Sequence, residues 1–469
     1  MAAESSPNHS KNTRAFRVGR VRAFLRGRAW YLCYHEHGRR RQPRVGPDRD
    51  LTRQTAAEIN AQLEAGAPSS LGFEPASVLE VRQRWLEQHE HVRRSSLQTI
   101  RRYRAATDHL IRFLAAERPL RRISDFRPAH AEEFVRYLRF LKTSPNGHPN
   151  SVPRRLRDSG VKFVLETCCT LFNYARRQRH LSPYGENPFL TVEIGRIPVE
   201  DAKPIVVFDR DLEQRFFEAC DDWQLPLFLT LLFTGLRPGE LIHLLLPDDL
   251  DLETGWLYVR NKLRLGWQVK TRNERDIPLT PVLVQILQQL VRNRCRGPVF
   301  LQRQFSGQRV PALVGMTPNM IAQQIDRDAV AFTGVTDAKL QRQARQRAAA
   351  AVWRKIGGLR TDWIRVEFMR ITRQLGLSEI TAPKTLRHSF ATILQDANVD
   401  PLVRNELMGH SPFGQTGAAG LGMTTVYTHT RPETKRMQLE RALSHRPAGE
   451  VAKCCLRRLC CRGSNSLVL

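Results

Sequence analysis

The residues of this chain that could do chemistry gather in residues 383–430, which read PKTLRHSFATILQDANVDPLVRNELMGHSPFGQTGAAGLGMTTVYTHT. This block contains Arg387 in KTLRH, His410 in LMGHS and Tyr427 in TTVYTH. After Tyr258 the chain has no tyrosine other than Tyr427. Cationic side chains and a hydroxyl, without an accompanying carboxylate cluster, suit a phosphodiester, because cations neutralise the phosphate oxygens while the hydroxyl attacks phosphorus.

Two upstream blocks add cations of the same kind. Residues 233–241 read FTGLRPGEL and contain Arg237, and residues 268–280 read QVKTRNERDIPLT and contain Lys270. A guanidinium stays charged and binds two oxygens at once, so arginine suits a phosphate clamp. A lysine can protonate a departing oxygen when its neighbours lower its pKa.

Taken in order, these motifs resemble those of the tyrosine recombinase family, also called the phage integrase family. TGLRPGEL resembles the family box T-G-x-R-x-x-E-L, KTLRHSFA resembles H-x-L-R-H-x-F-A, and TTVYTH resembles T-T-x-Y-x-H. The resemblance implies that Arg237 and Arg387 clamp the non-bridging phosphate oxygens and that His410 hydrogen-bonds the phosphate. It also implies that Lys270 protonates the departing 5′ oxygen and that Tyr427 is the nucleophile.

Neighbouring residues receive secondary roles or none. We expect Glu240 to support the arginine clamp from behind, although Arg237 could instead merely pair with this carboxylate. We expect His388 to be structural and leave the role of His429 open. Lys262 is a weaker substitute for Lys270.

The sequence departs from the family pattern in two places. Lys384 stands where the family usually has the first histidine of its second box, and it can donate to the phosphate but is a poor base while charged. Residues 413–422 read FGQTGAAGLG and are inserted between His410 and Tyr427. This glycine-rich insertion should be flexible, and it leaves open whether the tyrosine is poised in the free protein.

The charge balance also favours a nucleic-acid partner. The chain has 469 residues, 74 Lys and Arg against 46 Asp and Glu, and a net charge of +28. Such an excess indicates a polyanionic partner, with a merely basic soluble protein as the alternative. No apolar run approaches the roughly 18 residues of a membrane span. The polar start lacks the apolar core of a signal peptide. We therefore expect a cytoplasmic, nucleoid-associated protein.

Cysteine usage indicates neither a disulfide framework nor a metal site. The chain has nine cysteines, an odd number. A disulfide framework is not expected in a reducing cytosol. The pairs Cys454-Cys455 and Cys460-Cys461 lack the C-x-x-C spacing of zinc sites. We expect a disordered basic tail at 447–469 and no cofactor.

The elements that must position the candidate residues fall into three predicted domains. Residues 1–66 are dense in arginine, with an aromatic strand at 30–34, a turn at 35–38 and a helix at 52–64. They resemble the small β-rich arm-like domains of integrases, with a solvated charged hairpin as the alternative. Residues 65–75 read as a linker.

Residues 76–190 carry four apolar stripes at helical spacing with arginines on the outer faces. They resemble the helical core-binding (SAM-like) domain of the family. After a linker at 191–204, residues 204–446 form the predicted α+β catalytic domain. Its expected elements are a helix at 211–233, strands within 255–280, helices at 281–293 and 317–331, and an inserted helix at 336–356. That inserted helix matches nothing in the family pattern, and a DNA or partner contact and a plain exposed helix stay open.

The resemblance implies a mainly α fold with α+β parts and a function in site-specific DNA recombination through a covalent 3′-phosphotyrosine. It further implies a homotetramer on two double-stranded DNA sites, an accessory DNA-bending protein in some systems, and integration or excision of a phage or mobile element. We expect residues 431–446 to pack on a neighbouring subunit. The alternatives are a chromosome-dimer resolvase, transposase or topoisomerase-like enzyme using the same chemistry, and a catalytically impaired DNA-binding relative.

Overall fold

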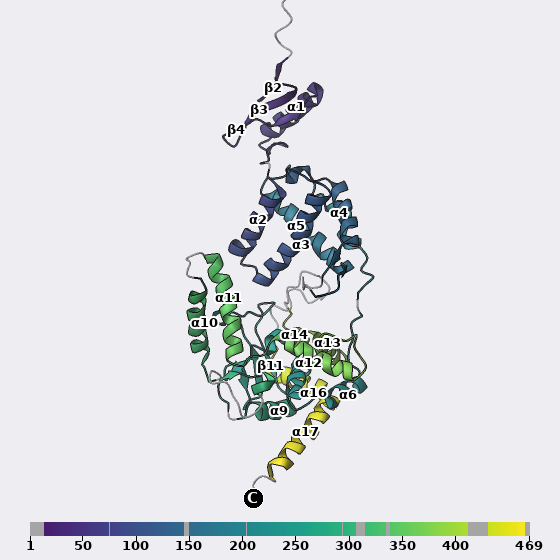
Figure 1. Cartoon of the computed structure of the whole chain (residues 1–469), viewed down its shortest axis with the longest axis vertical. Coiled ribbons are helices and arrows are strands. Elements are labelled where there is room, and N and C mark those ends of the chain that lie inside the picture. The colour runs from purple at the N-terminus through teal and green to yellow at the C-terminus, as the bar shows by residue number, and fades with distance from the viewer. Residues whose placement is uncertain are drawn as a thin grey trace, which may run out of the picture. The chain divides into compact units, whose positions relative to one another are not determined.

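The chain is mainly helical with small antiparallel sheets, as predicted (Figure 1). The structure is a computed structural model that describes residues 14–74, 76–144, 150–202, 204–292, 294–305, 315–333, 338–410 and 430–464. It divides into two compact units, Met1–Lys203 and Pro204–Leu469. Among the described residues, no helix has the length and apolar character needed to cross a membrane.

The first unit begins with a five-stranded antiparallel sheet and one helix. The elements are β1 (Ala15–Val18), β2 (Val21–Arg26), β3 (Ala29–Glu36), β4 (Arg39–Arg41), β5 (Arg44–Gly46) and α1 (Arg49–Glu64). In β2, Val21 and Ala23 are fully buried and alternate with exposed Arg22, so this arginine-rich stretch is a strand that the sequence reading missed. Trp30 in β3 and Ile59 in α1 belong to the core that joins the sheet and the helix.

The remainder of the first unit is a helical bundle. Its helices are α2 (Val78–Glu87), α3 (Leu97–Ala116), α4 (Pro128–Phe140) and α5 (Asp158–Arg177), with a π-helical turn η1 (Gln88–Val92) after α2. The four predicted stripes lie on these four helices and meet in one core. Short 3₁₀ turns follow at η4 (Leu190–Val192) and η5 (Ile194–Arg196). Val192, Ile194 and Ile197 pack against the helical core, so the first part of the expected linker belongs to the first unit, which ends at Lys203.

The second unit is built around a helix that is buried on all sides, α7 (Gln224–Thr234). Helices α9 (Pro281–Val291) and α13 (Lys384–Asp396) pack against it. The predicted single helix at 211–233 is instead two, α6 (Arg210–Glu218) and α7. The break occurs because the carboxylate of Asp221 accepts the backbone N–H groups of Trp223 and Gln224, at 3.0 and 2.9 Å.

The other elements of the second unit frame the candidate site. The strands are β8 (Leu245–Leu246), β9 (Leu250–Asp251), β10 (Trp256–Val259), β11 (Arg275–Pro278) and β12 (Gly297–Pro298). The helices are α8 (Pro238–Leu241), α10 (Pro318–Thr333), α11 (Ala338–Lys355), α12 (Thr361–Gln374), α14 (Pro401–Met408), α16 (Pro432–Leu443) and α17 (Pro447–Ser464). Strands β9, β10 and β11 form one antiparallel sheet, so β10 and β11 are the two limbs of a hairpin.

One expectation for the C-terminal end is wrong over the described residues. Residues 447–464 are the helix α17, whose Ala448 and Ala452 are fully buried in the main core, and not a disordered tail. In α16, Leu439 and Leu443 are buried in the same core, while Met437 is 61% exposed, so the expected contact of this segment with a neighbouring subunit stays a prediction. The apolar face of α17 was not recognised from the sequence, because cysteine and arginine are frequent in this stretch and the buried residues are small.

Helix α11 corresponds to the predicted inserted helix, and it is not a plain exposed one. Ala348, Val352 and Trp353 are buried in a cluster that includes residues of α10. Helices α10 and α11 lie side by side as a pair (Figure 1). The residues of α11 thus have a packing role on one face and a basic surface on the other.

Candidate active site

Arg387 ties together three segments that are far apart in the sequence. Arg387 lies in the first turns of α13, and only 6% of its surface is exposed to solvent. Its Nη1 donates to the carbonyl of Gly235, which ends α7, and its Nη2 donates to the carbonyl of Met408, which ends α14. Two carbonyl acceptors fix the plane of the guanidinium but do not neutralise its charge.

The surroundings of Arg387 lower its pKa to about 10, through burial and then through the nearby cation of Arg237. The guanidinium stays protonated at neutral pH, but its charged form is less stable in this site than it would be in water. An anion bound beside it would relieve that cost. The site is therefore prepared for an anionic ligand.

Arg237 is held by the carboxylate of Glu240 at the start of α8. Its Nη1 donates to Oε1 at 2.8 Å, and its backbone N–H donates to Oε2 at 2.9 Å. Pairing with Glu240 thus occurs, but it does not bury Arg237, whose side chain remains 23% exposed against 2% for Glu240. The pairing orients the guanidinium and leaves part of it accessible to a ligand.

Arg275 is the residue of the site that the sequence reading missed. It begins β11, its side chain is 4% exposed, and its Nη1 and Nη2 donate to Glu240 at 3.3 and 2.7 Å. Its Nε donates to the carbonyl of Leu407 at 2.9 Å. Burial alone would raise the pKa of Glu240, but the hydrogen bond and charge of Arg275, followed by the bonds from Arg237, lower it. The available signal was a basic residue two positions before Ile277, and so on the same face of the strand as this buried side chain.

His410 follows Gly409, whose φ of +61° ends α14 in the left-handed conformation. Partial burial and the cations of the surrounding arginines lower the pKa of His410; those arginines are Arg387, Arg237 and Arg275. The imidazole is therefore neutral at pH 7, with one nitrogen that donates and one that accepts. Hydrogen bonds bring two of these arginines to the same turn, because Arg387 donates to the carbonyl of Met408 and Arg275 to that of Leu407.

Lys270 reaches the same neighbourhood through its loop. The next residue, Thr271, donates its hydroxyl to the carbonyl of Gly409 at 3.1 Å. This hydrogen bond joins the residue after Lys270 to the residue before His410. Lys270 is exposed in the loop between β10 and β11. This position leaves its ammonium accessible to a ligand.

The two other candidate lysines, Lys384 and Lys262, have different surroundings. Lys384 is exposed at the first residue of α13, and its cation, after burial, lowers the pKa of His388. Lys262 is committed elsewhere, because its Nζ lies 2.8 Å from Oδ2 of Asp249 and its side chain is 10% exposed. The structure therefore does not favour Lys262 as a substitute for Lys270.

Tyr427, His429 and the insertion 413–422 lie outside the described residues. The chain is described again at Thr430, whose hydroxyl donates to Oε1 of Glu406 in α14 at 3.0 Å. The described residues on either side of this segment both lie at α14, because His410 follows the helix and Thr430 bonds to it. Chemically, the described part contains three guanidinium groups, one balancing carboxylate and an imidazole, a set of charges that suits an anion.

Comparison with known proteins gives relatives that share one activity in their names. No protein-family model matches the chain. Tyrosine recombinase XerC of Chlamydia caviae is 24% identical over 267 residues, which are 55% of this chain and 65% of the relative. Tyrosine recombinase XerC of Pelotomaculum thermopropionicum is 28% identical over 204 residues, 44% of this chain and 48% of the relative. The chain spans less than two thirds of the length of either.

The solved structures to which the chain is similar include two integrases. The Tn1549 transposon integrase in complex with a circular intermediate DNA has 19% identity and a TM-score of 0.46, covering 78% of this chain and 99% of that one. A lambda integrase dimer bound to a COC′ core site has 15% identity and a TM-score of 0.42, covering 87% of this chain and 95% of that one.

Proposed function

Because the chain belongs to the tyrosine recombinase family, we propose that it is a site-specific recombinase that cuts and rejoins double-stranded DNA. The observation that supports this most directly is a hydrogen-bond network over three separate segments. Arg275 bonds to Glu240, which holds Arg237, and to Leu407, while Arg387 bonds to Met408, two residues before His410. The combined charge of the three arginines exceeds the single carboxylate of Glu240. A phosphodiester supplies the negative charge that this excess requires.

In the proposed reaction, the phenolic oxygen of Tyr427 forms a bond to phosphorus and the bond from phosphorus to the 5′ oxygen breaks. The products are a 3′-phosphotyrosine and a 5′ hydroxyl, so the energy of the phosphodiester is kept for rejoining. The phenol gives its proton to water as it attacks, and the ammonium of Lys270 gives a proton to the departing oxygen. No metal or nucleotide is needed.

The arginines act on the charge that develops at phosphorus. Arg237 and Arg387 bind the non-bridging oxygens, and Arg275 acts through Glu240 and Leu407 to hold their frame. His410 donates a hydrogen bond to the phosphate from its neutral ring. Lys384 donates to the phosphate from the start of α13, in place of the usual histidine.

We further propose that the protein acts as a homotetramer on two DNA sites in the nucleoid, with an accessory DNA-bending protein where the sites require one. Integration or excision of a phage or mobile element is the purpose we favour. The supporting features are the arginine-rich sheet of β1–β5 and the net charge of +28. A topoisomerase-like enzyme would instead relax supercoiled DNA without pairing two sites.

The decisive experiment uses a nicked suicide DNA taken from the sequence flanking the gene. Wild type, Tyr427→Phe and the matched control Tyr258→Phe are incubated with it and run on a denaturing gel. A covalent protein–DNA band from wild type and Tyr258→Phe that disappears with Tyr427→Phe supports the proposal. If no band forms on DNA that all three bind in a mobility-shift assay, the catalytically impaired DNA-binding relative becomes the better description.

A further inference from the structure

Residues 260–274, which we call the lysine loop, join β10 to β11 and carry Lys270. A short 3₁₀ turn, η6 (Leu263–Leu265), forms the tip of the loop. Such a loop would be mobile on its own, because its ends are fixed but its tip has only itself to pack on. In this chain the tip instead lies against α11, the helix that has no counterpart in the family motifs.

Hydrogen bonds from side chains of α11 to backbone carbonyls hold the tip of the loop against this helix. The indole Nε1 of Trp353 donates to the carbonyl of Leu265 at 3.1 Å, and Trp353 is 7% exposed. Arg345 donates from Nη2 to the carbonyl of Arg264 at 2.9 Å. A Cβ placed on Gly266, whose φ is +75°, would lie 2.5 Å from the Cβ of Ala349. The helix and the loop therefore approach as closely as glycine allows.

Stacked rings extend this contact toward Lys270. The ring of His243 stacks on Trp267, with centroids 4.7 Å apart, and meets the edge of Trp353, with centroids 4.8 Å apart. Trp267 is three residues before Lys270. The Nζ of Lys262 lies 5.5 Å from the centre of the Trp267 ring. Aromatic pairs of this geometry add to the free energy gained by burial.

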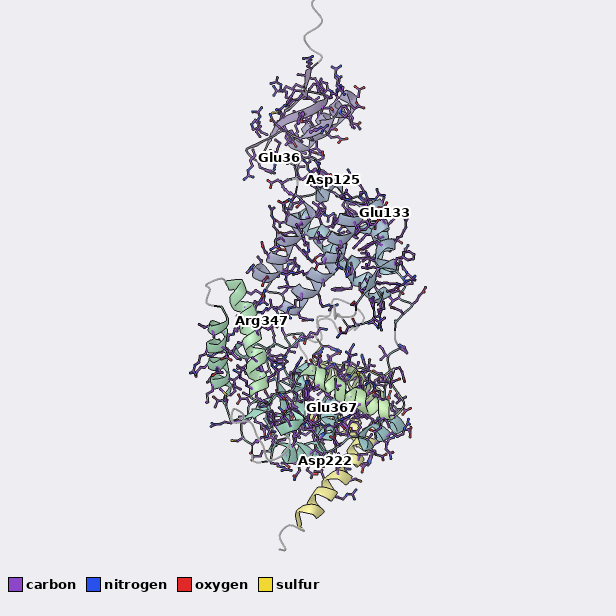
Figure 2. The ribbon with its side chains drawn as sticks, in the orientation of Figure 1. Glu36, Asp125, Glu133, Asp222, Arg347 and Glu367 are labelled. Atoms are coloured by element: carbon purple, nitrogen blue, oxygen red, sulfur yellow. The ribbon has the colours of Figure 1, made fainter. Side chains whose placement is uncertain are left out.

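Helix α11 is itself anchored, so it can serve as a support. Ile321 and Ile325 of α10 are fully buried in the same cluster as Trp353. Arg345 forms an ion pair with Asp326 of α10 at 3.1 Å, and Lys355 forms one with Asp328 at 3.3 Å. The exposed side of the helix carries Arg347 (Figure 2).

We propose that Trp353 is a positioning residue that fixes the lysine loop so that Lys270 can protonate the leaving oxygen. This inference rests on the proposed recombinase function. It assigns to the inserted helix a task in the chemical step rather than in DNA contact. Trp353 acts through Leu265 and His243, and the proton itself still comes from Lys270.

The test compares two leaving groups on the same nicked DNA. One substrate has the natural 5′ oxygen at the scissile phosphate, and the other has a bridging 5′ sulfur. When the bond from phosphorus to sulfur breaks, the thiolate leaves without a proton, because the pKa of a thiol is only about 8.5. A defect in positioning the acid should therefore slow cleavage of the oxygen substrate and spare the sulfur substrate.

For Trp353→Ala we expect cleavage of the oxygen substrate to fall roughly 10- to 100-fold, a part of the 10²- to 10⁴-fold that a general acid contributes. On the sulfur substrate the rate should stay within about 3-fold of wild type, as should that of Lys270→Ala. Trp353→Phe keeps a ring beside His243 but loses the N–H bond, so its oxygen-substrate rate should lie between those of Trp353→Ala and wild type. Arg347→Ala, on the exposed side of the same helix, should cleave both substrates as wild type does.

The outcomes separate this inference from the proposed function. If Trp353→Ala slows both substrates equally, Trp353 is structural and the inference is overturned, even though wild type still forms its tyrosine adduct. If Trp353→Ala does not fold, as judged by its thermal transition, the ratio of the two rates for Trp353→Phe decides in the same way. If wild type forms no adduct with either substrate on bound DNA, the proposed function fails, and with it the premise of this inference.

Discussion

Arg275 and Glu240 form a buried, two-pronged ion pair in which Nη1 and Nη2 of the arginine lie 3.3 and 2.7 Å from the two carboxylate oxygens. The same arginine binds the carbonyl of Leu407, and the same glutamate binds Arg237. The pair thus links the strand that follows the lysine loop, Arg237 and the turn that presents His410. It is the frame on which the anion site is assembled.

Glu240→Gln tests that frame, because it removes the charge with little change of shape. The substitution leaves Arg275 buried without its counter-ion, and breaking a buried pair in this way typically costs about 3–5 kcal/mol. We expect the free energy of unfolding, measured in urea, to fall by that amount, and adduct formation to be lost. Glu253→Gln, at an exposed position, is the control and should change stability by less than about 0.5 kcal/mol. Equal behaviour of the two variants would contradict the assigned role.

Gly409→Ala tests the turn before His410. The φ of Gly409 is +61°, and an added Cβ would lie 2.9 Å from Nη1 and 3.0 Å from Cδ of Arg275. The left-handed conformation costs a non-glycine residue about 1–2 kcal/mol, and the clash also displaces the arginine. We expect a lower thermal midpoint and slower cleavage with near-normal DNA binding. Gly376→Ala, also at positive φ but in open space, is the matched control, and its cleavage rate should not change.

Lys262→Met distinguishes the two lysines of the hairpin. The substitution leaves Asp249, whose side chain is 1% exposed, without its cation, so stability should fall by about 3–5 kcal/mol. The double variant Lys262→Met with Asp249→Asn should recover much of that loss, because neither charge then remains buried. Urea unfolding of the two single variants and the double variant measures the coupling. Additive losses would show that the ion pair contributes nothing to the fold.

Acid should destabilise the protein through His243. Burial, followed by the cation of Lys262, lowers the pKa of His243 to about 4, although its bond to the carbonyl of Gly239 acts in the opposite sense. In the unfolded chain the pKa is about 6.5, so the unfolded state binds the proton first. The stabilising contribution is present above pH 6.5 and is lost as pH falls toward 4.

Between pH 7.5 and 5 this loss is about 2 kcal/mol for one such group. His243→Phe keeps an aromatic ring but cannot take up a proton, so its stability should fall less over the same interval. Urea unfolding of both proteins at the two pH values gives the difference. Parallel curves for the two proteins would mean that His243 is not held neutral.

The sequence by itself was sufficient for the features that are local. Helical stripes such as Val81 and Trp85 in α2 were predicted because a repeat of 3.6 residues reports a buried face directly. The motifs around Arg237, Arg387 and His410 indicated a phosphodiester because cationic side chains neutralise phosphate oxygens. Their roles in the reaction remain predictions.

Tertiary structure alone decided what each buried face packs against. Arg275 is held by the carbonyl of Leu407, a residue 132 positions away, and no local pattern contains that partner. Trp353 and the small residues Ala448 and Ala452 looked like parts of an exposed helix and a loose tail, because charged neighbours dominate their stretches. They are buried because other segments supply the apolar surfaces that they lack. Burial is a property of the assembled chain, and periodicity records only that a face exists.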